Sequence, residues 1–111
     1  MTVVAAGLIF HEDKLLIAQR KADDELGLYW EFPGGTVEAG ESPEEALERE
    51  LLEELDITTR TDNIFDVRYV SRENGDLLIL YYYSTYLAGS PKTLDCNDFR
   101  WISPTEIAGF D

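Results

Sequence analysis

Acidic side chains crowd one short segment of this 111-residue chain. Between Glu38 and Glu54 there are eight glutamates and a single basic residue, Arg49. On an α-helix, Glu50, Glu53 and Glu54 share one arc of the surface, because residues three and four apart are neighbours. Like charges at these spacings repel by about 0.2–0.5 kcal/mol per pair in an isolated helix. One arginine cannot neutralise three carboxylates, whereas a hard divalent cation can, so the segment predicts an oxygen-ligated site for Mg²⁺ or Mn²⁺.

The same segment also has the pattern of an ordinary solvated amphipathic helix, which is the simpler interpretation. Leu47, Leu51 and Leu55 form an apolar stripe, and the carboxylates border this stripe instead of lying opposite it. Residues 33–35, with the sequence Pro-Gly-Gly, lie just upstream, where the glycines let a bare backbone come close to the helix. These two features favour a metal site over a purely solvated face.

The sequence predicts where the helix that carries these carboxylates begins. Ser42 is a typical N-cap, Pro43 suits the first helical position, and Glu45 completes a capping box. The helix is predicted to run to about Leu55. A second capping-box pattern at residues 103–106 predicts another helix that continues to Asp111.

Apolar and β-branched segments on both sides of the helix predict strands. Asn74 and Gly75 form the strongest short hairpin signal in the chain. Strands before and after one long helix indicate the α/β or α+β class with a mixed sheet. The predicted strands cover residues 2–10, 14–20, 30–32, 64–71, 77–87 and 99–102, the predicted loops cover 21–29 and 89–98, and a sharp turn is predicted at 33–35.

Composition excludes several classes of protein. The chain has 23 Asp and Glu residues against 9 Lys and Arg residues, a formal net charge of −14, so it lacks the basic surface that tracks a nucleic-acid polymer. With 44% hydrophobic and 12% aromatic residues it is too apolar for a disordered chain. No apolar run approaches the ~20 residues of a membrane span, and Cys96 is the single cysteine. We expect one reduced, cytoplasmic domain over residues 1–111, with no membrane partner.

The acidic segment resembles the Nudix box. Gly35 is followed after five residues by Glu41 and after seven more by the run 49–57, and every charged position of that pattern is filled. The family has glycine near the helix end, where this chain has Asp56. Aspartate adopts left-handed conformations more readily than most residues, so we still expect the helix to end there.

Residues outside the box extend the resemblance to the MutT-type branch, which includes nucleoside triphosphate pyrophosphohydrolases. Arg20 and the segments 30–35 and 101–104 match this branch, so the likeness covers nearly the whole chain. It implies an α/β/α sandwich around a mixed sheet and hydrolysis of a nucleoside diphosphate linked to another moiety. Members of the branch continue with a fuller C-terminal helix, so we expect that helix to be truncated here.

The resemblance also implies roles for particular residues. The three clustered glutamates of the helix and the carbonyl oxygen of Gly34 correspond to ligands of the divalent cation. Arg49 and Glu41 correspond to residues that orient this cluster by ion pairing. Arg20 corresponds to a phosphate contact, although a surface ion pair with Asp23 or Asp24 is the alternative for an arginine at a strand end. The residues expected to border the substrate are Arg20, Glu31, Phe32, Gly34 and Gly35.

A loop carboxylate, Asp95, lies six residues before Trp101, where this branch often has a carboxylate near the metal. We expect Glu50 or Glu53, with Asp95 as a further candidate, to act as the general base that takes the proton from the attacking water, and the choice stays open. Aromatic residues in two predicted strands can stack a base, although strand alternation places about half of them in the core. These residues are Trp30, Phe32, Tyr81, Tyr82, Tyr83 and Tyr86.

Three functions are compatible with these residues. The leading one is hydrolysis of a nucleoside triphosphate, such as oxidised dGTP, CTP or dCTP, to the monophosphate and pyrophosphate. The others are hydrolysis of a different nucleoside-diphosphate-linked substrate, such as a sugar nucleotide or dinucleoside, and a non-catalytic nucleotide-binding module. A degenerate module would usually have lost one of the three clustered glutamates, so the filled cluster favours an enzyme. Base preference and oligomeric state stay open.

Overall fold

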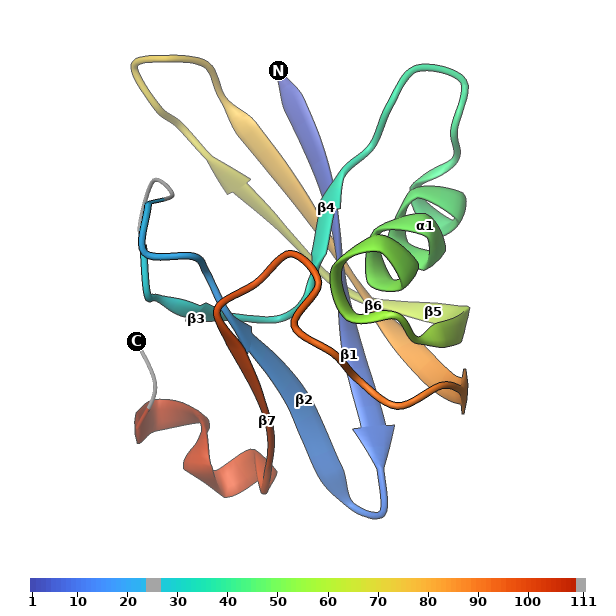
Figure 1. Cartoon of the computed structure of the whole chain (residues 1–111). Coiled ribbons are helices and arrows are strands. Elements are labelled where there is room, and N and C mark those ends of the chain that lie inside the picture. Colours follow the sequence, from blue (N-terminus) through green and yellow to red (C-terminus); the bar gives the residue numbers. More distant parts are fainter. Residues whose placement is uncertain (24–26, 110–111) are drawn as a thin grey trace.

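One mixed sheet organises the chain in the computed structural model, which describes residues 1–23 and 27–109 (Figure 1). The strand order is β3-β2-β1-β6-β5, with β4 paired to β1 and β7 paired to β2. β1 and β6 run parallel, and the other described pairs are antiparallel. The strands are β1 (Thr2–His11), β2 (Lys14–Gln19), β3 (Trp30–Glu31), β4 (Gly34–Thr36), β5 (Thr58–Val70), β6 (Leu77–Ala88) and β7 (Asp98–Ile102).

Helix α1 (Pro43–Leu55) begins and ends where the sequence predicts. The Ser42 hydroxyl accepts a hydrogen bond from the Glu45 amide at 3.1 Å, and the Glu45 carboxylate accepts one from the Ser42 amide at 3.0 Å. These two bonds complete the capping box. Asp56 ends the helix in the left-handed region, at φ 57°, and its amide donates to the Leu52 carbonyl.

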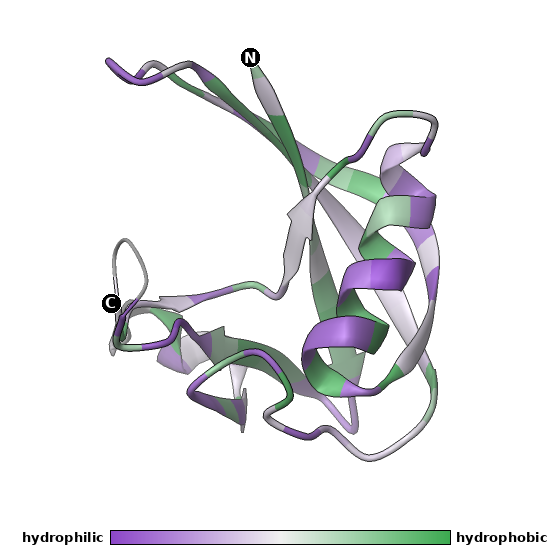
Figure 2. Cartoon of the chain, turned by 45° about the horizontal axis from the view of Figure 1, so that its top comes forward, coloured by the Kyte–Doolittle hydropathy of each residue, from purple (hydrophilic) through white to green (hydrophobic). Residues whose placement is uncertain are grey.

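The apolar stripe of α1 packs on one face of the sheet. Leu47, Leu51 and Leu55 are fully buried in a core that includes Ile9 of β1 and Leu16 of β2. Green and purple alternate along α1 in Figure 2, as expected for a helix with one buried face. Burial of one aliphatic side chain of this size contributes about 1.5–3 kcal/mol, so the stripe anchors the carboxylates beside it.

The opposite face of the sheet carries a second, smaller layer. Leu15 and Ile102 are buried on that face. A 3₁₀ helix, η1 (Pro104–Gly109), adds Ile107 to the same side. The predicted α/β class with a mixed sheet is confirmed, and within the described residues η1 is what forms the second helical layer. No helix in the described part of the chain is long and apolar enough to cross a membrane.

The C-terminal segment differs from the predicted α-helix. The Glu106 carboxylate accepts a hydrogen bond from the Ser103 amide at 2.9 Å, as a capping box requires. The Glu106 amide, however, donates to the Ser103 carbonyl instead of the hydroxyl. This bond between residues three apart gives a tighter 3₁₀ turn. The predicted end at Asp111 lies outside the described residues, as do residues 24–26 of the predicted loop 21–29.

One predicted strand boundary and one predicted turn differ from the structure, whereas the other strand ends agree within one residue. β5 begins at Thr58 instead of Ile64, and register irregularities between these two residues interrupt the apolar alternation that would have marked the strand. The predicted turn at 33–35 is confined to a bend at Pro33, because Gly34–Thr36 continues as β4 beside β1. The glycines are therefore required by close approach of the backbone and not by a turn.

The β5–β6 hairpin is predicted correctly, and its tip has a specific place in the fold. The parallel register pairs Thr2 with Leu77, and the Thr2 amide donates to the Asp76 carbonyl at 2.9 Å. The tip therefore lies beside the start of β1. The Asp76 carboxylate accepts hydrogen bonds from the Tyr69 hydroxyl and, at 3.4 Å, from the Arg72 amide, so the tip is internally ordered.

Candidate active site

The two glycines of strand β4 let its backbone lie very close to strand β1 and to helix α1. An added Cβ on Gly34 would lie 2.0 Å from the carbonyl oxygen of Ala5 in β1. An added Cβ on Gly35 would lie 2.3 Å from the carboxyl group of Glu50 on α1. Both distances are far below van der Waals contact. Glycine is required at position 34, where the obstacle is backbone, whereas a side chain at position 35 would displace the carboxylate of Glu50. The backbone of β4 consequently lies directly against the Glu50 carboxylate.

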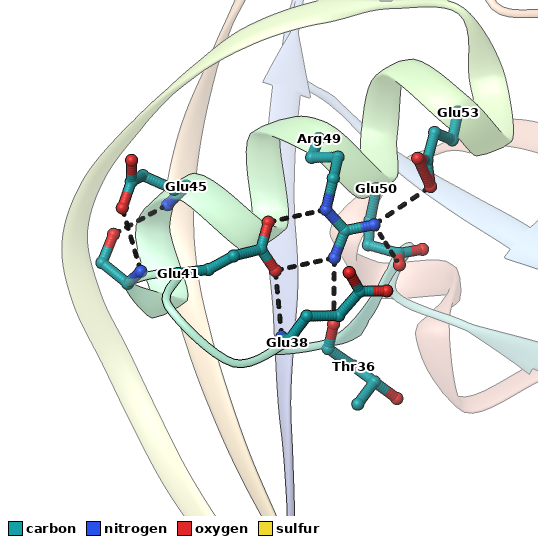
Figure 3. Close-up of polar contacts among 8 residues, drawn as sticks. Thr36, Glu38, Glu41, Glu45, Arg49, Glu50 and Glu53 are labelled. Carbon is teal, nitrogen blue, oxygen red and sulfur yellow. Dashed lines mark hydrogen bonds and ion pairs between the residues drawn. The ribbon is translucent and has the colours of Figure 1, made fainter.

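Arg49 connects three glutamates and a backbone carbonyl in one charged network (Figure 3). Its Nε and Nη2 atoms donate to the two carboxylate oxygens of Glu41, at 2.6 and 2.8 Å, in a bidentate ion pair. Its Nη1 atom donates to Glu50 Oε1 at 2.9 Å and to Glu53 Oε1 at 3.0 Å. Nη2 also donates to the Thr36 carbonyl at 3.2 Å, which ties the network to the end of β4.

The bidentate ion pair fixes the charges of both its members. The hydrogen bonds from Arg49 and from the Glu38 amide hold the pKa of Glu41 at about 2, below its usual 4.5. The same contact with Glu41 raises the pKa of Arg49. Glu41 therefore stays ionised as a counter-ion for Arg49 across the neutral pH range.

Burial and like charge act together on Glu54 and Glu50. Burial is the main cause that raises the pKa of Glu54 to about 8, and the neighbouring carboxylates Glu31, Glu50 and Asp95 add to it. Burial also raises the pKa of Glu50, while the hydrogen bond from Arg49 opposes this shift. Carboxylates that resist ionisation side by side mark a position where a cation binds favourably.

A polar cleft of about 460 Å³ brings most of the predicted site residues together. It is lined by β1, β4, α1 and the loops that follow β2 and β6. Segments far apart in the sequence thus contribute to one concave surface, as the resemblance to the Nudix family implies. The predicted residues that line the cleft are Arg20, Glu31, Phe32, Gly34, Gly35, Glu50, Glu54 and Asp95.

Three other predicted residues do not line the cleft. Arg49 and Glu41 form their ion pair beside it, with side chains that are 26% and 19% exposed. Glu53 lies on the outer side of α1, where its side chain is 59% exposed and contacts Arg49. Of the three clustered glutamates, Glu50 and Glu54 therefore face the cleft and Glu53 adjoins it.

Two ion pairs stand at the rim of the cleft. Arg20 Nη1 donates to Glu31 Oε1 at 3.1 Å. Lys21 Nζ donates to Asp95 Oδ1 at 2.8 Å. Of the alternative partners that the sequence suggests for Arg20, Asp24 lies outside the described residues.

An apolar cavity of about 300 Å³ adjoins the cleft, and the two spaces share Glu31 and Phe32. Trp30, Phe32 and Tyr81 give it an aromatic lining, and the rings of Phe32 and Tyr81 meet edge to face with centroids 6.0 Å apart. An apolar, aromatic cavity beside a charged cleft suits a flat heterocyclic ring.

The remaining aromatic candidates lie elsewhere. Tyr82 is buried under α1, Tyr83 contacts Phe65, and Tyr86 packs against Trp101. Strand alternation along β6 places Tyr82 and Tyr86 on the face opposite Tyr81, against the core under α1. Tyr83 shares the face of Tyr81 but lies farther along the strand, where it is exposed.

A family model for the NUDIX domain matches residues 1–111 of this chain. This chain belongs to the Nudix family. It is 33% identical over 111 residues to the CTP pyrophosphohydrolase of Escherichia coli, an alignment that covers 96% of this chain and 78% of that protein. It is also 31% identical over 101 residues to the 8-oxo-dGTP diphosphatase of Escherichia coli, covering 90% of this chain and 78% of that protein.

Solved structures agree with this assignment. The solution structure of the E. coli ORF135 protein matches the fold with a TM-score of 0.88 at 30% sequence identity. The match covers 99% of this chain and 79% of that one. The sheet and helix α1 are thus those of the Nudix fold.

Nudix hydrolases use divalent metal ions, and the donor set of this Nudix chain fits such an ion. Among the described residues no three His, Cys, Asp or Glu side chains are grouped closely enough to form a metal site as they stand. The carboxylates of Glu50 and Glu54 nevertheless face the cleft, and the pKa of each is raised, so a cation would relieve their charge. Carboxylate and carbonyl oxygens are hard ligands of the kind that Mg²⁺ and Mn²⁺ take.

Two cations of the Nudix cleft, Lys21 and Arg72, are absent from the sequence prediction. Lys21 directly follows Arg20, a predicted phosphate contact, so this position in the sequence could have identified Lys21 as a cleft residue. Arg72 reaches the cleft because the hairpin tip lies beside β1, and no local sequence pattern reveals the parallel pairing of β1 with β6. Cys96 also lines the cleft, but it packs in the core, where burial raises the pKa of its thiol to about 11.

Proposed function

We propose that this Nudix chain is a nucleoside triphosphate pyrophosphohydrolase that uses Mg²⁺, with Mn²⁺ as the alternative. The observation that carries the proposal is the charged cleft, which shares Glu31 and Phe32 with an aromatic cavity. The cleft suits a metal-bound phosphate chain and the cavity suits a base, which are the two parts of a nucleotide. The relatives named for CTP and 8-oxo-dGTP support the same substrate class.

The metal ligands proposed are Glu50, Glu53 and Glu54 with the carbonyl oxygen of Gly34. A bound divalent cation would offset the repulsion between an acidic chain and an anionic substrate and would lower the pKa of a bound water. Glu50 and Glu54 already face the cleft. Glu53 shares the Nη1 donor of Arg49 with Glu50, which keeps it next to them.

Arg49 and Glu41 act as positioning residues in this proposal. The bidentate pair with Glu41 fixes the plane of the guanidinium group, so its Nη1 atom holds one oxygen of Glu50 in a set direction. The other Glu50 oxygen stays available for the cleft. Loss of either member of the pair would loosen the carboxylate that the cation needs.

The chemical step needs a phosphate contact and a base. Arg20, with its planar fork of donors, binds the phosphate chain at the rim of the cleft. Water attacks phosphorus in line, its proton passes to Glu50, Glu53 or Asp95, and the bond to the pyrophosphate oxygen breaks. The products are a nucleoside monophosphate and pyrophosphate.

A substrate panel tests this function. The chain is incubated with ATP, GTP, CTP, UTP, their deoxy forms, and oxidised guanine and cytosine forms, and pyrophosphate release is measured with Mg²⁺ and with excess chelator. We expect metal-dependent pyrophosphate release from at least one triphosphate. Full turnover in chelator would contradict the role of the metal, and no turnover of any triphosphate would contradict the function.

Nucleoside diphosphate sugars and dinucleoside polyphosphates complete the panel. Turnover restricted to them would move the chain to the alternative substrate class. Nucleotide binding without any turnover would identify a non-catalytic module. Residues 1–111 are proposed to act as a single Nudix domain, since the family model spans all of them.

A further inference from the structure

Lys21 and Asp95 face each other at the rim of the cleft from two different loops. Lys21 follows β2, whereas Asp95 lies between β6 and β7. The Lys21 ammonium group and the Asp95 carboxylate are 2.8 Å apart, and both residues line the cleft. The ion pair therefore lies in the lining of the cleft that is proposed to bind the phosphate chain.

Hydrogen bonds hold the backbone of Asp95, whereas its side chain is largely exposed. Its amide donates to the Glu54 carbonyl at 3.2 Å, and the Leu94 amide donates to the same oxygen at 3.1 Å. The Lys92 amide donates to the Leu55 carbonyl at 2.8 Å. The last turn of α1 therefore sets the position of the loop, while the Asp95 side chain remains 70% exposed.

An exposed ion pair of this kind can be exchanged. Such pairs contribute about 0–1 kcal/mol, because water and salt screen them. The side chain of Lys21 is 49% exposed, so another anion can reach its ammonium group. A triphosphate carries several negative charges and is a stronger competitor for a lysine than one aspartate.

The excess of negative charge in the cleft makes each of its basic residues important for binding an anionic substrate. Its lining includes three basic residues and four carboxylates, and the whole chain carries a net charge of −14. An anionic substrate is repelled by this field at long range. A cation that already faces the cleft is therefore valuable for binding phosphate, and a carboxylate that occupies it reduces that value.

We propose that Lys21 is a phosphate-binding residue and that Asp95 competes with the substrate phosphate for it. The proposal rests on the proposed function, because it requires a substrate with a phosphate chain. In the free protein Asp95 is the described partner of Lys21, and in the complex the phosphate replaces it. The Asp95 carboxylate is then released at the edge of the metal site.

Binding of inorganic triphosphate tests this competition without a base and without turnover. Its Kd is measured by titration calorimetry at a fixed Mg²⁺ concentration. We expect Lys21→Met to raise the Kd about three- to fivefold and Asp95→Asn to lower it by a similar factor, the range of one exposed ion pair. Lys21→Arg keeps the charge and should keep the Kd close to that of the wild type.

The double variant separates competition from a general effect of charge. If Asp95 acts through Lys21, Asp95→Asn changes the Kd by less than about 1.5-fold in the Lys21→Met background, since the coupling energy has gone. An equal gain in both backgrounds would overturn the proposal, because the carboxylate would then repel phosphate directly. An unchanged Kd in Lys21→Met, or weaker binding in Asp95→Asn, would overturn it as well.

The Lys92–Asp56 ion pair offers a matched control. Its atoms are 3.2 Å apart, it joins the same loop to the end of the same helix, and neither residue lines the cleft. Lys92→Met and Asp56→Asn alter the net charge as the test variants do, and we expect both to keep the wild-type Kd. If the wild type hydrolyses nucleotides but Lys21→Met leaves the Kd unchanged, only this inference is rejected. If no nucleotide is hydrolysed, the proposed function is rejected.

Discussion

At the scale of single residues, Glu53 is the most exposed of the three clustered glutamates, and its described contact is with Arg49. We expect Glu53→Gln to lower turnover about tenfold or more, the range for losing a group that supports a metal site. The fold should stay intact, because the change keeps the shape of the side chain and removes repulsion from Glu50. Steady-state kinetics and thermal unfolding measure the two effects.

A glutamate on the same helix provides the control for this variant. Glu44 is exposed in the first turn of α1 and lies outside the cleft lining. Glu44→Gln makes the same change in net charge, and its turnover should equal that of the wild type. A loss of melting temperature in Glu53→Gln that matches its loss of activity would instead assign Glu53 a structural role.

Arg20 is a second residue whose role can be measured. We expect Arg20→Ala to raise KM for nucleotides more than it lowers kcat, because a phosphate contact of equal strength in the ground and transition states affects binding alone. Arg20→Lys should restore the affinity in part, since lysine lacks the planar fork. An unchanged KM across several nucleotides would mean that Arg20 forms only a surface ion pair.

At the scale of elements, strand β4 gives a paired prediction about its two glycines. Gly34→Ala would push a methyl group into the Ala5 carbonyl, which is backbone and cannot yield, so we expect a loss of about 2 kcal/mol or more in stability. Gly35→Ala would meet the flexible end of Glu50. It should therefore lose activity with a smaller loss of stability. Chemical unfolding and kinetics on both variants distinguish them, and equal destabilisation would contradict the assignment.

Elements with local signals could be predicted from the sequence, and those that depend on distant partners could not. The capping box at Ser42 and the left-handed end at Asp56 use neighbouring residues only, so both ends of α1 are confirmed. Strand β4 depends on its pairing with β1, so it looks like a turn in the sequence. The C-terminal segment that begins at Ser103 has the residues of a capping box. The Glu106 amide donates to the Ser103 carbonyl instead of its hydroxyl, however, and the segment forms a 3₁₀ helix.

At the scale of the whole molecule, the half-buried carboxylate of Glu54 couples stability to pH. Its pKa is raised from 4.5 to about 8 in the folded chain, so the folded state keeps a proton that the unfolded state has already lost. The stability that this group contributes is complete below pH 4.5 and is lost as the pH rises to about 8. We expect the melting temperature of the metal-free protein to fall across this range.

The variant Glu54→Gln isolates this effect, because its amide does not titrate. Its melting temperature should fall less than that of the wild type between pH 4.5 and 8, measured by circular dichroism in chelator. Parallel curves for the two proteins would show that Glu54 titrates normally. Added Mg²⁺ should stabilise the wild type more at the upper end of the range, where the carboxylate is ionised.

The composition of the cleft is a property of the whole chain. Gly35, Glu50 and Glu54 of the Nudix box meet there because one strand and one helix carry them. Arg72 joins them only through the parallel pairing of β1 and β6, which places a hairpin tip far along the sequence beside the N-terminal strand. The separation of Glu53 from the cleft likewise depends on how α1 is rotated on the sheet, and a helical wheel does not fix that rotation.

The hydrogen bonds between the β6–β7 loop and the last carbonyls of α1 have a consequence for local unfolding. The amides of Lys92, Leu94 and Asp95 can exchange with deuterium only when these bonds open. The loop and the last turn of the helix therefore form one cooperative unit. In an exchange experiment these three amides should be protected to the same degree as the helix end, although they belong to a segment without regular secondary structure.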